Sequence, residues 1–368
     1  MSTYHKQGGG EQRPPYIDAK FNIHDIVLST PRQWPKISIV TPSYNQGQFI
    51  EETILSVINQ NYPNLEYIII DGGSTDNTID VIRKYEKYIT YWISEADEGQ
   101  TDAINKGLAK CTGEVFNWLN SDDYFEPEAL IQIGKAFKDS STYVFSGKER
   151  RVNEKGGEIE ISDGTSILDT LSKTIGKCHI DQPSTFFRLS ALKPLLPLNN
   201  AFHYLMDGEI WMRYLLYWGQ ENVVKSNAIL VNFRHHNTSK TISLYTNFQI
   251  DKNTFENNLI KKFAIDNIIK NILLGRESWN YSKKLKINFH IDENVIISFF
   301  CARSITQLYS DGKYTSAKKC LMFIKTHYPN LFNLYPALNY YMKVLLIPVD
   351  ILSFVRNVKK SLSGYFYK

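Results

Sequence analysis

Cysteine is scarce in this 368-residue chain. The four cysteines, Cys111, Cys178, Cys301 and Cys320, lie far apart, and no CxxC pair occurs. This pattern lacks the density of small secreted domains that are stapled by disulfides, so we expect reduced, structural thiols. The N-terminal segment MSTYHKQGGGEQRPPYID also lacks the apolar core of a signal peptide. The two absences together predict a cytoplasmic protein.

A strong excess of one charge is missing as well. The formal net charge is +4, and the lysines are scattered rather than gathered in one block. This gives no indication of nucleic acid as a partner. What the chain does contain is ample apolar material, because 43% of its residues are hydrophobic and 22% are charged. Such a composition is typical of a folded, globular protein.

Glycine and proline residues interrupt residues 1–35, which we expect to form an N-terminal arm without regular elements. Regular elements are predicted from residue 36 onwards. Four apolar runs, KISIVTPSYN, LEYIIIDGG, TYWISEAD and EVFNWLNSDD, read as strands, and the segments between them have helical periodicity. Strands that are apolar on both faces and alternate with helices predict an α/β fold with a mainly parallel sheet. Ligands of such sheets bind at the carboxyl ends of the strands.

Acidic and polar residues stand at those carboxyl ends. The stretch FNWLNSDDYF leads from an apolar run straight into Asp122 and Asp123. Adjacent carboxylates repel, so they cost stability unless a cation or hydrogen-bond donors meet them. A metal ion is the obvious candidate, and the alternative is a simple exposed turn. Together with the polar loops after the first and second strands, these residues predict a binding site on one rim of the sheet.

Four motifs in this region resemble the nucleotide-sugar-binding half of family 2 glycosyltransferases. They are IVTPSYNQGQFIEETILSVINQ, IIIDGGSTDNT, DEGQTDAINKGL and WLNSDD, and they cover Lys36 to about Asp139. IDQPSTFFR, YLMDGEIWMRY and FRHHNTSKT extend the resemblance to about Thr241. It implies a GT-A fold, a Rossmann-like, mainly parallel sheet flanked by helices, in a domain over residues 36–245. Residues 36–140 would be the donor half and residues 141–245 the acceptor half.

The resemblance also implies which residues hold the donor. Near the nucleobase it places Thr41, Pro42, Tyr44, Asn45, Asp71, Gly73 and Ser74. A carboxylate at Asp71 would accept a hydrogen bond from the imide of uracil, which makes a UDP-sugar the first choice of donor. Near the ribose and the donor sugar it places Asp97, Gln100, Asp102, Asn105, Asn120 and Ser121. For Asp102 and Asn105, helix capping is the alternative.

The acid pair resembles the DXD signature of the family, in which a divalent cation bridges a carboxylate and the diphosphate. Oxygen ligands suit Mn²⁺ or Mg²⁺. The usual first acid is Asn120 here, so the metal would depend on Asp122, with Asp123 orienting the donor sugar or binding through water. In FRHHNTSKT, Arg234 and Lys240 would clamp the diphosphate. His236 either joins the metal shell or is structural.

The acceptor side is expected around the helix in YLMDGEIWMRYLLYWG. In the family an acid at the position of Asp207 is the general base that deprotonates the acceptor hydroxyl, and inversion of configuration follows. Glu209 is the competing base, and a helix cap is the alternative for Asp207. Gln182 and Ser184 in QPSTFFR would border the donor sugar or the acceptor, although this stretch also fits an edge strand.

Residues 246–368 are predicted to form a mostly α-helical C-terminal region. The segment SITQLYSDGKYTSAKKCLMFIKTHYPN has the sequence pattern of one helix-turn-helix unit of a tetratricopeptide-like repeat. The last 36 or so residues combine aromatic, apolar and basic side chains, which fits either an interfacial helix on the inner face of a membrane or a packed helix pair. Lys343, Pro348 and Asp350 interrupt the run and argue against a transmembrane helix.

The sequence therefore predicts an inverting, metal-dependent glycosyltransferase that uses a nucleotide sugar and a glycan or lipid-linked acceptor in the assembly of a bacterial surface polysaccharide. One alternative is a non-catalytic nucleotide- or sugar-binding scaffold, which Asn120 makes conceivable. A sugar nucleotidyltransferase is weaker, because TPSYNQGQF lacks a basic phosphate loop. A dehydrogenase is weaker still, since no GxGxxG follows the first predicted strand.

Overall fold

The computed structural model describes residues 34–236 and 312–330, with further positions within 247–258, 305–309 and 346–353. These residues divide into two compact units. The first takes in the described chain up to Ser166, His179–Tyr214 and Gln220–Asp251. The second takes in Ile167–Cys178, Leu215–Gly219 and the described positions after Lys252. Lys240 lies outside the described residues.

The first unit begins with a parallel half-sheet. Its strands are β1 (Ile37–Ser43), β2 (Leu65–Asp71), β3 (Tyr91–Ser94) and β4 (Val115–Trp118), and all pair in parallel in the order β3-β2-β1-β4. Every residue of β1 is buried. This is the expected result for a central strand whose apolar side chains meet helices on both faces. The predicted parallel sheet is confirmed.

The other half of the sheet is mixed. It consists of β8 (Thr185–Arg188), β6 (Val144–Asn153), β9 (Val223–His235) and β5 (Tyr124–Phe125), and β7 (Glu158–Ile161) forms a hairpin with β6. β8 runs antiparallel to both β4 and β6 and so joins the two halves. The edge-strand interpretation of QPSTFFR is therefore wrong, because this segment has a partner on each side. Nine strands of the described residues form one sheet.

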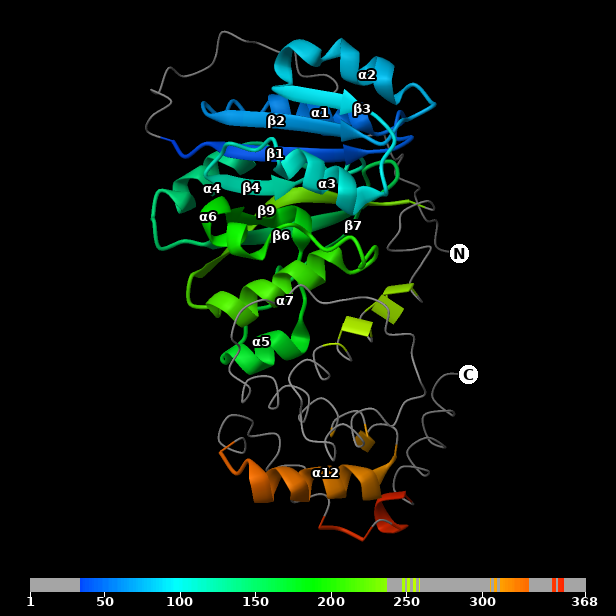
Figure 1. Cartoon of the computed structure of the whole chain (residues 1–368), viewed down its shortest axis with the longest axis vertical. Helices are drawn as coiled ribbons and strands as arrows, with labels where there is room; N and C mark the ends of the chain where they lie inside the picture. Colours follow the sequence, from blue (N-terminus) through cyan, green and yellow to red (C-terminus); the bar gives the residue numbers. More distant parts are fainter. Residues whose placement is uncertain are drawn as a thin grey trace, which may run out of the picture. The chain divides into compact units, whose positions relative to one another are not determined.

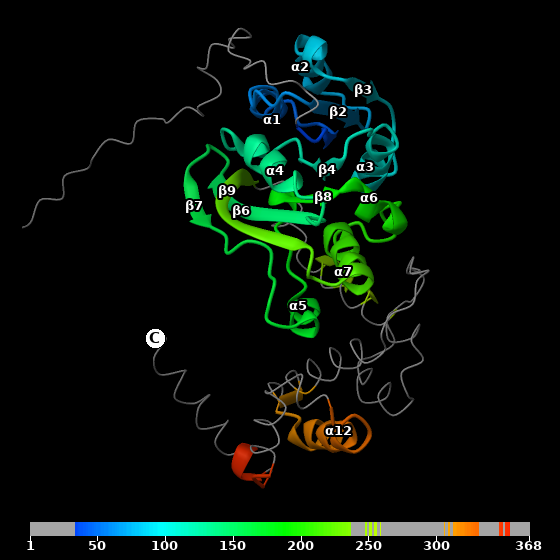
Figure 2. The same cartoon turned by 90° about the vertical axis from the view of Figure 1, so that its left-hand side faces the viewer.

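Helices cover both faces of this sheet, as Figures 1 and 2 show. On one face lie α1 (Ile50–Ile58) and α4 (Ala129–Phe137), and on the other lie α3 (Gln100–Leu108) and α6 (Leu189–Leu192). The main core lies under α1 and α4, where Ile54, Val57 and Ile133 pack with Ile39 and Phe186. The remaining elements of this unit are α2 (Thr78–Lys84), η3 (Glu86–Tyr88), η4 (Gln182–Ser184), η5 (Lys193–Leu195) and the start of α7 (Met206–Trp218).

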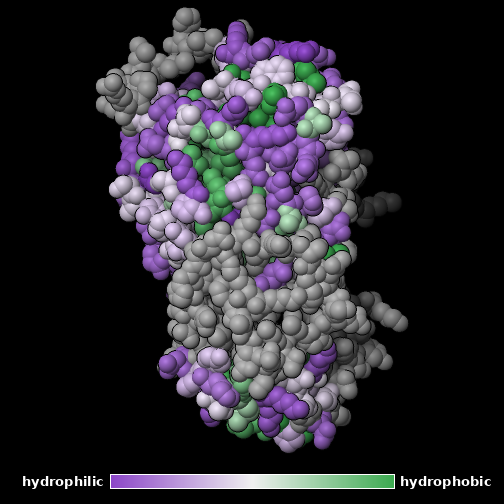
Figure 3. Space-filling view, viewed as in Figure 1, coloured by the Kyte–Doolittle hydropathy of each residue, from purple (hydrophilic) through white to green (hydrophobic). Residues whose placement is uncertain are grey.

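The second unit contains α5 (Leu171–Lys177) and α12 (Tyr314–His327). The sequence predicts a helix at α12, and its inward face is buried at Tyr314, Ala317, Leu321 and Ile324. Most of the segment proposed as an interfacial helix lies outside the described residues. None of the helices in the described part of the chain has the length and apolarity that a bilayer crossing requires. Where Figure 3 colours the surface, hydrophilic residues cover most of it.

Candidate active site

A pocket of about 940 Å³ opens where the strands of the first unit end. Its walls come from the loops after β1, β2, β3 and β4, from η4, from the start of α7 and from the end of β9. The parallel strands deliver their carboxyl ends to this rim, which is where ligands bind in sheets of this type. All of the lining residues belong to the first compact unit.

The loop after β1 forms the outer wall. Tyr44 is 60% exposed and lines the pocket beside Pro42. The Ser43 hydroxyl and the Gln46 side-chain carbonyl oxygen also belong to lining residues, are buried, and have no hydrogen-bond partner among the described residues. Buried polar atoms without partners are costly. Both atoms are therefore suited to meeting polar groups of a ligand.

Asp71 organises the neighbouring loop after β2 from behind the pocket wall. It is fully buried and accepts hydrogen bonds from the Gly73 and Ser74 backbone N–H groups and from the Ser74 and Ser94 hydroxyls. Ser74 in turn accepts a hydrogen bond from the Asn45 backbone N–H at 2.7 Å. Gly72 lines the pocket, and a Cβ there would lie 2.7 Å from Asp97 Oδ2. A larger residue at this position would force the Asp97 carboxylate to shift.

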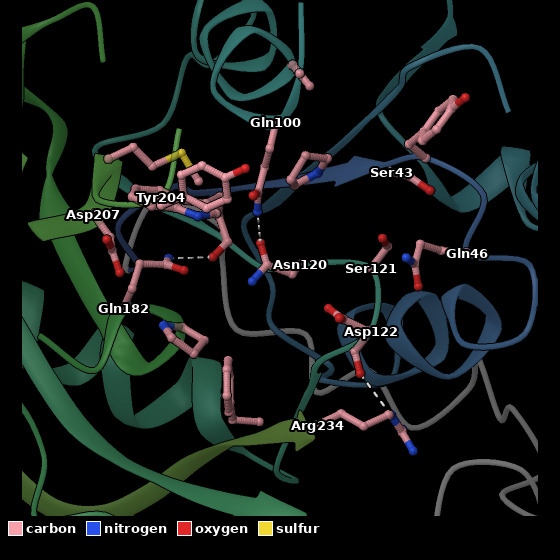
Figure 4. Close-up of a pocket in the computed structure, with 18 of the residues that line it drawn as sticks. Ser43, Gln46, Gln100, Asn120, Ser121, Asp122, Gln182, Tyr204, Asp207 and Arg234 are labelled. Atoms are coloured by element: carbon pink, nitrogen blue, oxygen red, sulfur yellow. Dashed lines mark hydrogen bonds between the residues drawn. The ribbon is translucent and has the colours of Figure 1, made fainter. Parts of the chain in front are cut away.

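The start of α3 places Gln100 over the centre of the pocket. Gly99, with φ of 109°, turns the chain into the helix, and its N–H donates to Asp97 Oδ1 at 2.8 Å. Gln100 Nε2 donates to Asn120 Oδ1 at 2.7 Å, and Asn120 Nδ2 donates to Asp123 Oδ2 at 3.2 Å. Asn120 is thus held by α3 above and by the acid pair below. Figure 4 shows the Gln100–Asn120 pair near the middle of the pocket.

The two acids after β4 have different environments. Asp122 lines the pocket, and its Oδ2 lies 2.9 Å from His236 Nε2. Asp123 is 1% exposed, does not line the pocket, and accepts a hydrogen bond from the Arg234 backbone N–H at 3.0 Å. Burial, with the charge of Asp122, raises the pKa of Asp123 well above its usual range. Asp122 therefore faces the ligand, and Asp123 supports the loop that carries it.

Arg234 fastens this loop to the sheet. It is 3% exposed, and its guanidinium donates to the Asp122 carbonyl at 2.9 Å, to the Glu154 carbonyl at 2.8 Å and to Glu52 Oε2 at 2.5 Å. Its guanidinium carbon lies 5.1 Å from the ring centroids of Phe49 and Tyr124. Each guanidinium nitrogen therefore has a protein partner. Arg234 still lines the pocket, but its hydrogen bonds hold the loop of Asp122 in place.

Asp207 stands at the other side of the pocket, in the first turn of α7. Ile210, Trp211 and Tyr214 are fully buried, as their helical spacing predicts, and they anchor the helix that presents Asp207. Asp207 Oδ1 accepts a hydrogen bond from the Gly208 N–H at 2.7 Å. The surrounding protein raises the pKa of Asp207, against smaller opposing effects of that hydrogen bond and of His179. Figure 4 places Asp207 and Asp122 on opposite sides of the Gln100–Asn120 pair.

Glu209, the competing candidate for the general base, is engaged by Arg213 instead. It is fully buried, accepts hydrogen bonds from Arg213 Nε at 2.9 Å and Nη2 at 2.7 Å, and does not line the pocket. Ser184 is likewise buried away from the pocket, donating to backbone carbonyls. Gln182 does line the pocket, and its Nε2 donates to Asn117 Oδ1 and to the Trp118 carbonyl, each at 2.9 Å.

The pocket thus gathers many, but not all, of the residues expected from the sequence. Those that line it are Pro42, Tyr44, Asp97, Gln100, Asn120, Ser121, Asp122, Gln182, Asp207, Arg234 and His236. Those that are described and do not line it are Thr41, Asn45, Asp71, Gly73, Ser74, Asp102, Asn105, Asp123, Ser184 and Glu209. Within the second group, Asp71 and Asp123 accept backbone hydrogen bonds that hold the adjoining loops in place.

Sequence reasoning overlooked several lining residues. They are Gln46, Glu149, Arg151, His179, Asp181 and Tyr204. Asp181 adjoins the QPSTFFR motif, so motif proximity was an available signal for this residue. Ser43 and His235, which stand beside predicted site residues in the motifs, also line the pocket. Glu149 and Arg151 lie on a strand without a motif, and only the pairing of β6 with β9 brings them to the pocket.

Known proteins resemble this chain in sequence and in fold. Residues 38–196 match the model of glycosyl transferase family 2. An uncharacterized glycosyltransferase of Rickettsia typhi is 25% identical over 301 residues, which are 76% of this chain and 92% of that protein. TuaG of Bacillus subtilis, named as a candidate glycosyltransferase of teichuronic acid biosynthesis, is 36% identical over 119 residues, 31% of this chain and 46% of TuaG.

Among solved structures, residues 1–349 of S. aureus TarS in complex with UDP share the fold. The TM-score is 0.50 at 17% identity, with 89% of this chain and 91% of that chain covered. The same TarS segment in complex with UDP-GlcNAc gives a TM-score of 0.50 at 16% identity, covering 89% and 92%. The expected α/β fold, with a mainly parallel sheet between helices, is therefore confirmed.

Proposed function

The chain belongs to glycosyltransferase family 2, and from this premise we propose that it transfers a sugar from a UDP-sugar to a hydroxyl of a glycan or lipid-linked acceptor, with inversion of configuration. The enzyme class follows from the family; the donor, the acceptor and the roles of the residues are the proposal. Similarity to TuaG supports a place in the assembly of a bacterial surface polysaccharide.

One observation carries the proposal. A single pocket is lined on one side by Asp122 with His236 and on the other by Asp207. Sugar transfer from a nucleoside diphosphate needs two separated functions, one for the departing diphosphate and one for the proton of the incoming hydroxyl. A volume of about 940 Å³ leaves room for both substrates between them.

The donor half of the pocket suits a nucleoside. Exposed Tyr44 offers an aromatic face, while Ser43 and Gln46 offer buried polar atoms that lack hydrogen-bond partners in the described part of the chain. Asp97 and Gln100 lie on the next loop, where the ribose and the donor sugar would follow. TarS binds UDP and UDP-GlcNAc in a fold of the same kind, which supports a uridine nucleotide here.

The residues present fit a divalent cation that is shared with the substrate. Among the described residues no group of three His, Cys, Asp or Glu side chains could hold a metal by itself. Asp122 and His236 supply two ligands, and Mg²⁺ or Mn²⁺ is commonly bound by one or two carboxylates together with substrate phosphates. Such a cation, when bound, offsets the charge of the leaving diphosphate.

Asp207 takes the role of general base in this proposal. The acceptor oxygen attacks the anomeric carbon from the face opposite the diphosphate, and its proton passes to the Asp207 carboxylate. The bond between the anomeric carbon and the diphosphate oxygen breaks, and its electron pair leaves with UDP. Asp207 borders the pocket in a turn that is anchored by buried α7 residues, so the carboxylate is held in place for this step.

The test compares Asp207→Asn with the matched control Asp80→Asn, which removes an acid that is 83% exposed and lies outside the pocket. We expect Asp207→Asn to lower sugar transfer by roughly 10²–10⁴-fold, the usual contribution of a positioned base. Thermal shifts with UDP should be unchanged, because the donor half is intact. Asp80→Asn should behave as the wild type in both measurements.

Two outcomes would contradict the proposal. Turnover close to wild type in Asp207→Asn would remove Asp207 from the base role. A wild-type protein that binds UDP-sugars but releases no UDP, with any acceptor or with water, would favour the non-catalytic scaffold instead. Release of UDP in water is therefore the first measurement to make, since it requires no knowledge of the acceptor.

A further inference from the structure

A group of charged side chains on the acceptor side of the pocket has no part in the mechanism above. Glu149 and Arg151 come from β6, and His179 and Asp181 come from the segment before η4. All four line the pocket. Glu149 is 5% exposed and Asp181 is 2% exposed. Carboxylates are rarely buried to this degree without a structural or functional reason.

The charges in this group are paired within the protein. Arg151 Nε donates to Glu149 Oε1 at 3.1 Å, and the same guanidinium also reaches Glu160 on β7. Ser162 Oγ donates to Asp181 Oδ2, and His179 Nε2 lies 2.9 Å from Asp181 Oδ1. Apart from this ion-pair contact, Asp181 Oδ1 has no partner among the described residues. It borders the pocket and can receive a donor from a ligand.

The group adjoins the proposed base. His179 lies close enough for its charge to act on Asp207. Gln182, the residue after Asp181, is drawn on the same side of the pocket as Asp207 in Figure 4. Phe233, half-buried on β9, also lines the pocket and offers an apolar ring. A ligand whose hydroxyl reaches Asp207 would therefore place its neighbouring groups against these side chains.

The charge balance indicates the chemistry of that ligand. An anionic group would meet two buried carboxylates, which repel it. A cationic group would have to displace Arg151 or His179, which already neutralise them. A neutral sugar fits, because each hydroxyl both donates and accepts: it can donate to Asp181 Oδ1 or Glu149 and accept from Arg151 or His179. Burial and the charge of Asp181 raise the pKa of Glu149 to about 7, while Arg151 and His179 oppose the rise.

We propose that Glu149, Arg151, His179 and Asp181 form the acceptor-sugar subsite and select a neutral sugar over one that carries a carboxylate. The inference rests on the proposed function, since it assigns the second substrate of the same pocket. The paired charged side chains form hydrogen bonds with the hydroxyl groups of the acceptor sugar and so set the specificity. An acidic acceptor sugar is excluded by repulsion.

The experiment measures UDP release from the best of a panel of UDP-sugars, with and without simple acceptors. The acceptors are methyl glucoside, galactoside and mannoside, each beside its uronic acid counterpart. We expect the neutral glycosides to stimulate UDP release and the uronides to do so at least about tenfold less, since one lost charged hydrogen bond is worth a factor of this size. Stimulation by no neutral glycoside, or equal stimulation by the uronides, overturns the subsite.

Variants separate this role from a structural one. Glu149→Gln and Asp181→Asn should raise the KM for the neutral glycoside about tenfold and narrow its advantage over the uronide, and they should lower acceptor-stimulated UDP release more than acceptor-free release. His179→Gln, whose side chain is 40% exposed in the native protein, gives the same readout if the buried variants fail to fold. The control Glu158→Gln removes an acid on β7 outside the pocket and should change nothing.

The readouts also keep the two proposals apart. If the wild type releases no UDP, either with any acceptor or with water, the proposed function fails. If acceptor-free release is present, but the variants lower it in step with acceptor-stimulated release, the function stands and the subsite fails, because the four residues would then support the whole pocket rather than read the acceptor.

Discussion

At the scale of single residues, Asp207 combines contact with the pocket and a raised pKa. Both follow from its place in the first turn of a helix whose next turns are buried. Asp123 shows the opposite combination, a raised pKa without a place in the pocket lining. A perturbed pKa alone therefore does not identify the base in this site, and geometry must decide.

The pH dependence of transfer tests this assignment. A base acts in its ionised form, so kcat/KM should rise with pH as Asp207 loses its proton and then level off. Because burial raises the pKa of Asp207, the rise should be centred above the value of about 3.9 for a free aspartate. The measurement is a pH–rate profile at saturating UDP-sugar, made in wild type and in Asp207→Asn.

In Asp207→Asn the residual activity should have lost this rise. Persistence of the same rise in the variant would assign it to another group. Glu149, with a pKa of about 7, is the group to check next, and Glu149→Gln would remove its contribution. The pH–rate profiles of the two variants together thus show whether the rise reflects ionisation of Asp207 or of Glu149.

Residue roles were only partly predictable from the sequence. Asp122, Gln100 and Asp207, which the motifs single out, line the pocket, because each stands at the end of a strand or the start of a helix. The motifs assigned the metal to Asp122 and the donor sugar to Asp123, but they did not indicate that Asp123 is buried outside the pocket lining. The separation of the two acids comes from the Arg234 backbone N–H, which engages Asp123 from a strand more than 100 residues away.

At the scale of elements, the pairing of β5 with β9 links residues 36–140 to residues 141–245, as the pairing of β4 with β8 also does. Tyr124 and Phe125 pair with Asn232 and Val231 in an antiparallel register. Arg234 follows on β9 and reaches back to the Asp122 carbonyl. The acid pair is therefore positioned by a strand from the far end of the domain, and not only by the strand that precedes it.

Replacing Arg234 by Met should loosen this connection. The change removes three guanidinium hydrogen bonds and leaves Glu52 buried without its partner. Loss of one member of a buried ion pair costs about 3–5 kcal/mol, so we expect a fall in the free energy of unfolding of that order. Urea denaturation measures it, and Arg83→Met, on an exposed face of α2, is the matched control.

The alternative role for Arg234, a diphosphate clamp, makes a different prediction. If Arg234 serves to bind the diphosphate, Arg234→Met should have a free energy of unfolding near that of the wild type and should show only weaker binding of UDP. That result would show that the hydrogen bonds of Arg234 rearrange when the nucleotide binds, and would assign this residue to the donor.

The elements themselves were predictable in the parallel half and less so beyond it. β1 to β4 are short apolar runs separated by amphipathic helices, a pattern that sequence periodicity detects. β6 and β9 carry charged residues such as Arg150, Arg151 and Lys225 and are joined by long-range pairing with register shifts. Their partners depend on contacts that no local pattern encodes, so the subsite they build was missed.

At the scale of the whole molecule, the pocket belongs to one compact unit, while the second unit contains α5 and α12. The domain boundary proposed near residue 245 remains a prediction, as does membrane contact through the C-terminal segment, much of which lies outside the described residues. The likeness to TarS covers 89% of this chain at a low identity, so it supports the fold and leaves the chemistry to the residues.

The thermal stability of the whole protein should increase when the donor and the cation bind together. A ligand that binds only the folded state raises the free energy of unfolding by about 2.7 kcal/mol at 100 times its Kd. For a domain of this size that corresponds to a rise in Tm of roughly 5–10 °C. We expect UDP-sugar with Mn²⁺ to produce such a shift in the first thermal transition, and either component alone to produce less.

Asp122 makes this thermal test specific. With Asp122 and His236 as its protein ligands among the described residues, the cation needs the diphosphate to complete its coordination, so the nucleotide and the cation should stabilise each other. Asp122→Asn should abolish the gain from Mn²⁺ while keeping the smaller shift from UDP-sugar alone, and Asp80→Asn should keep both. An equal shift from UDP-sugar in EDTA and in Mn²⁺ would show that the nucleotide is held without the metal, and would leave Asp122 and His236 with no role at the diphosphate.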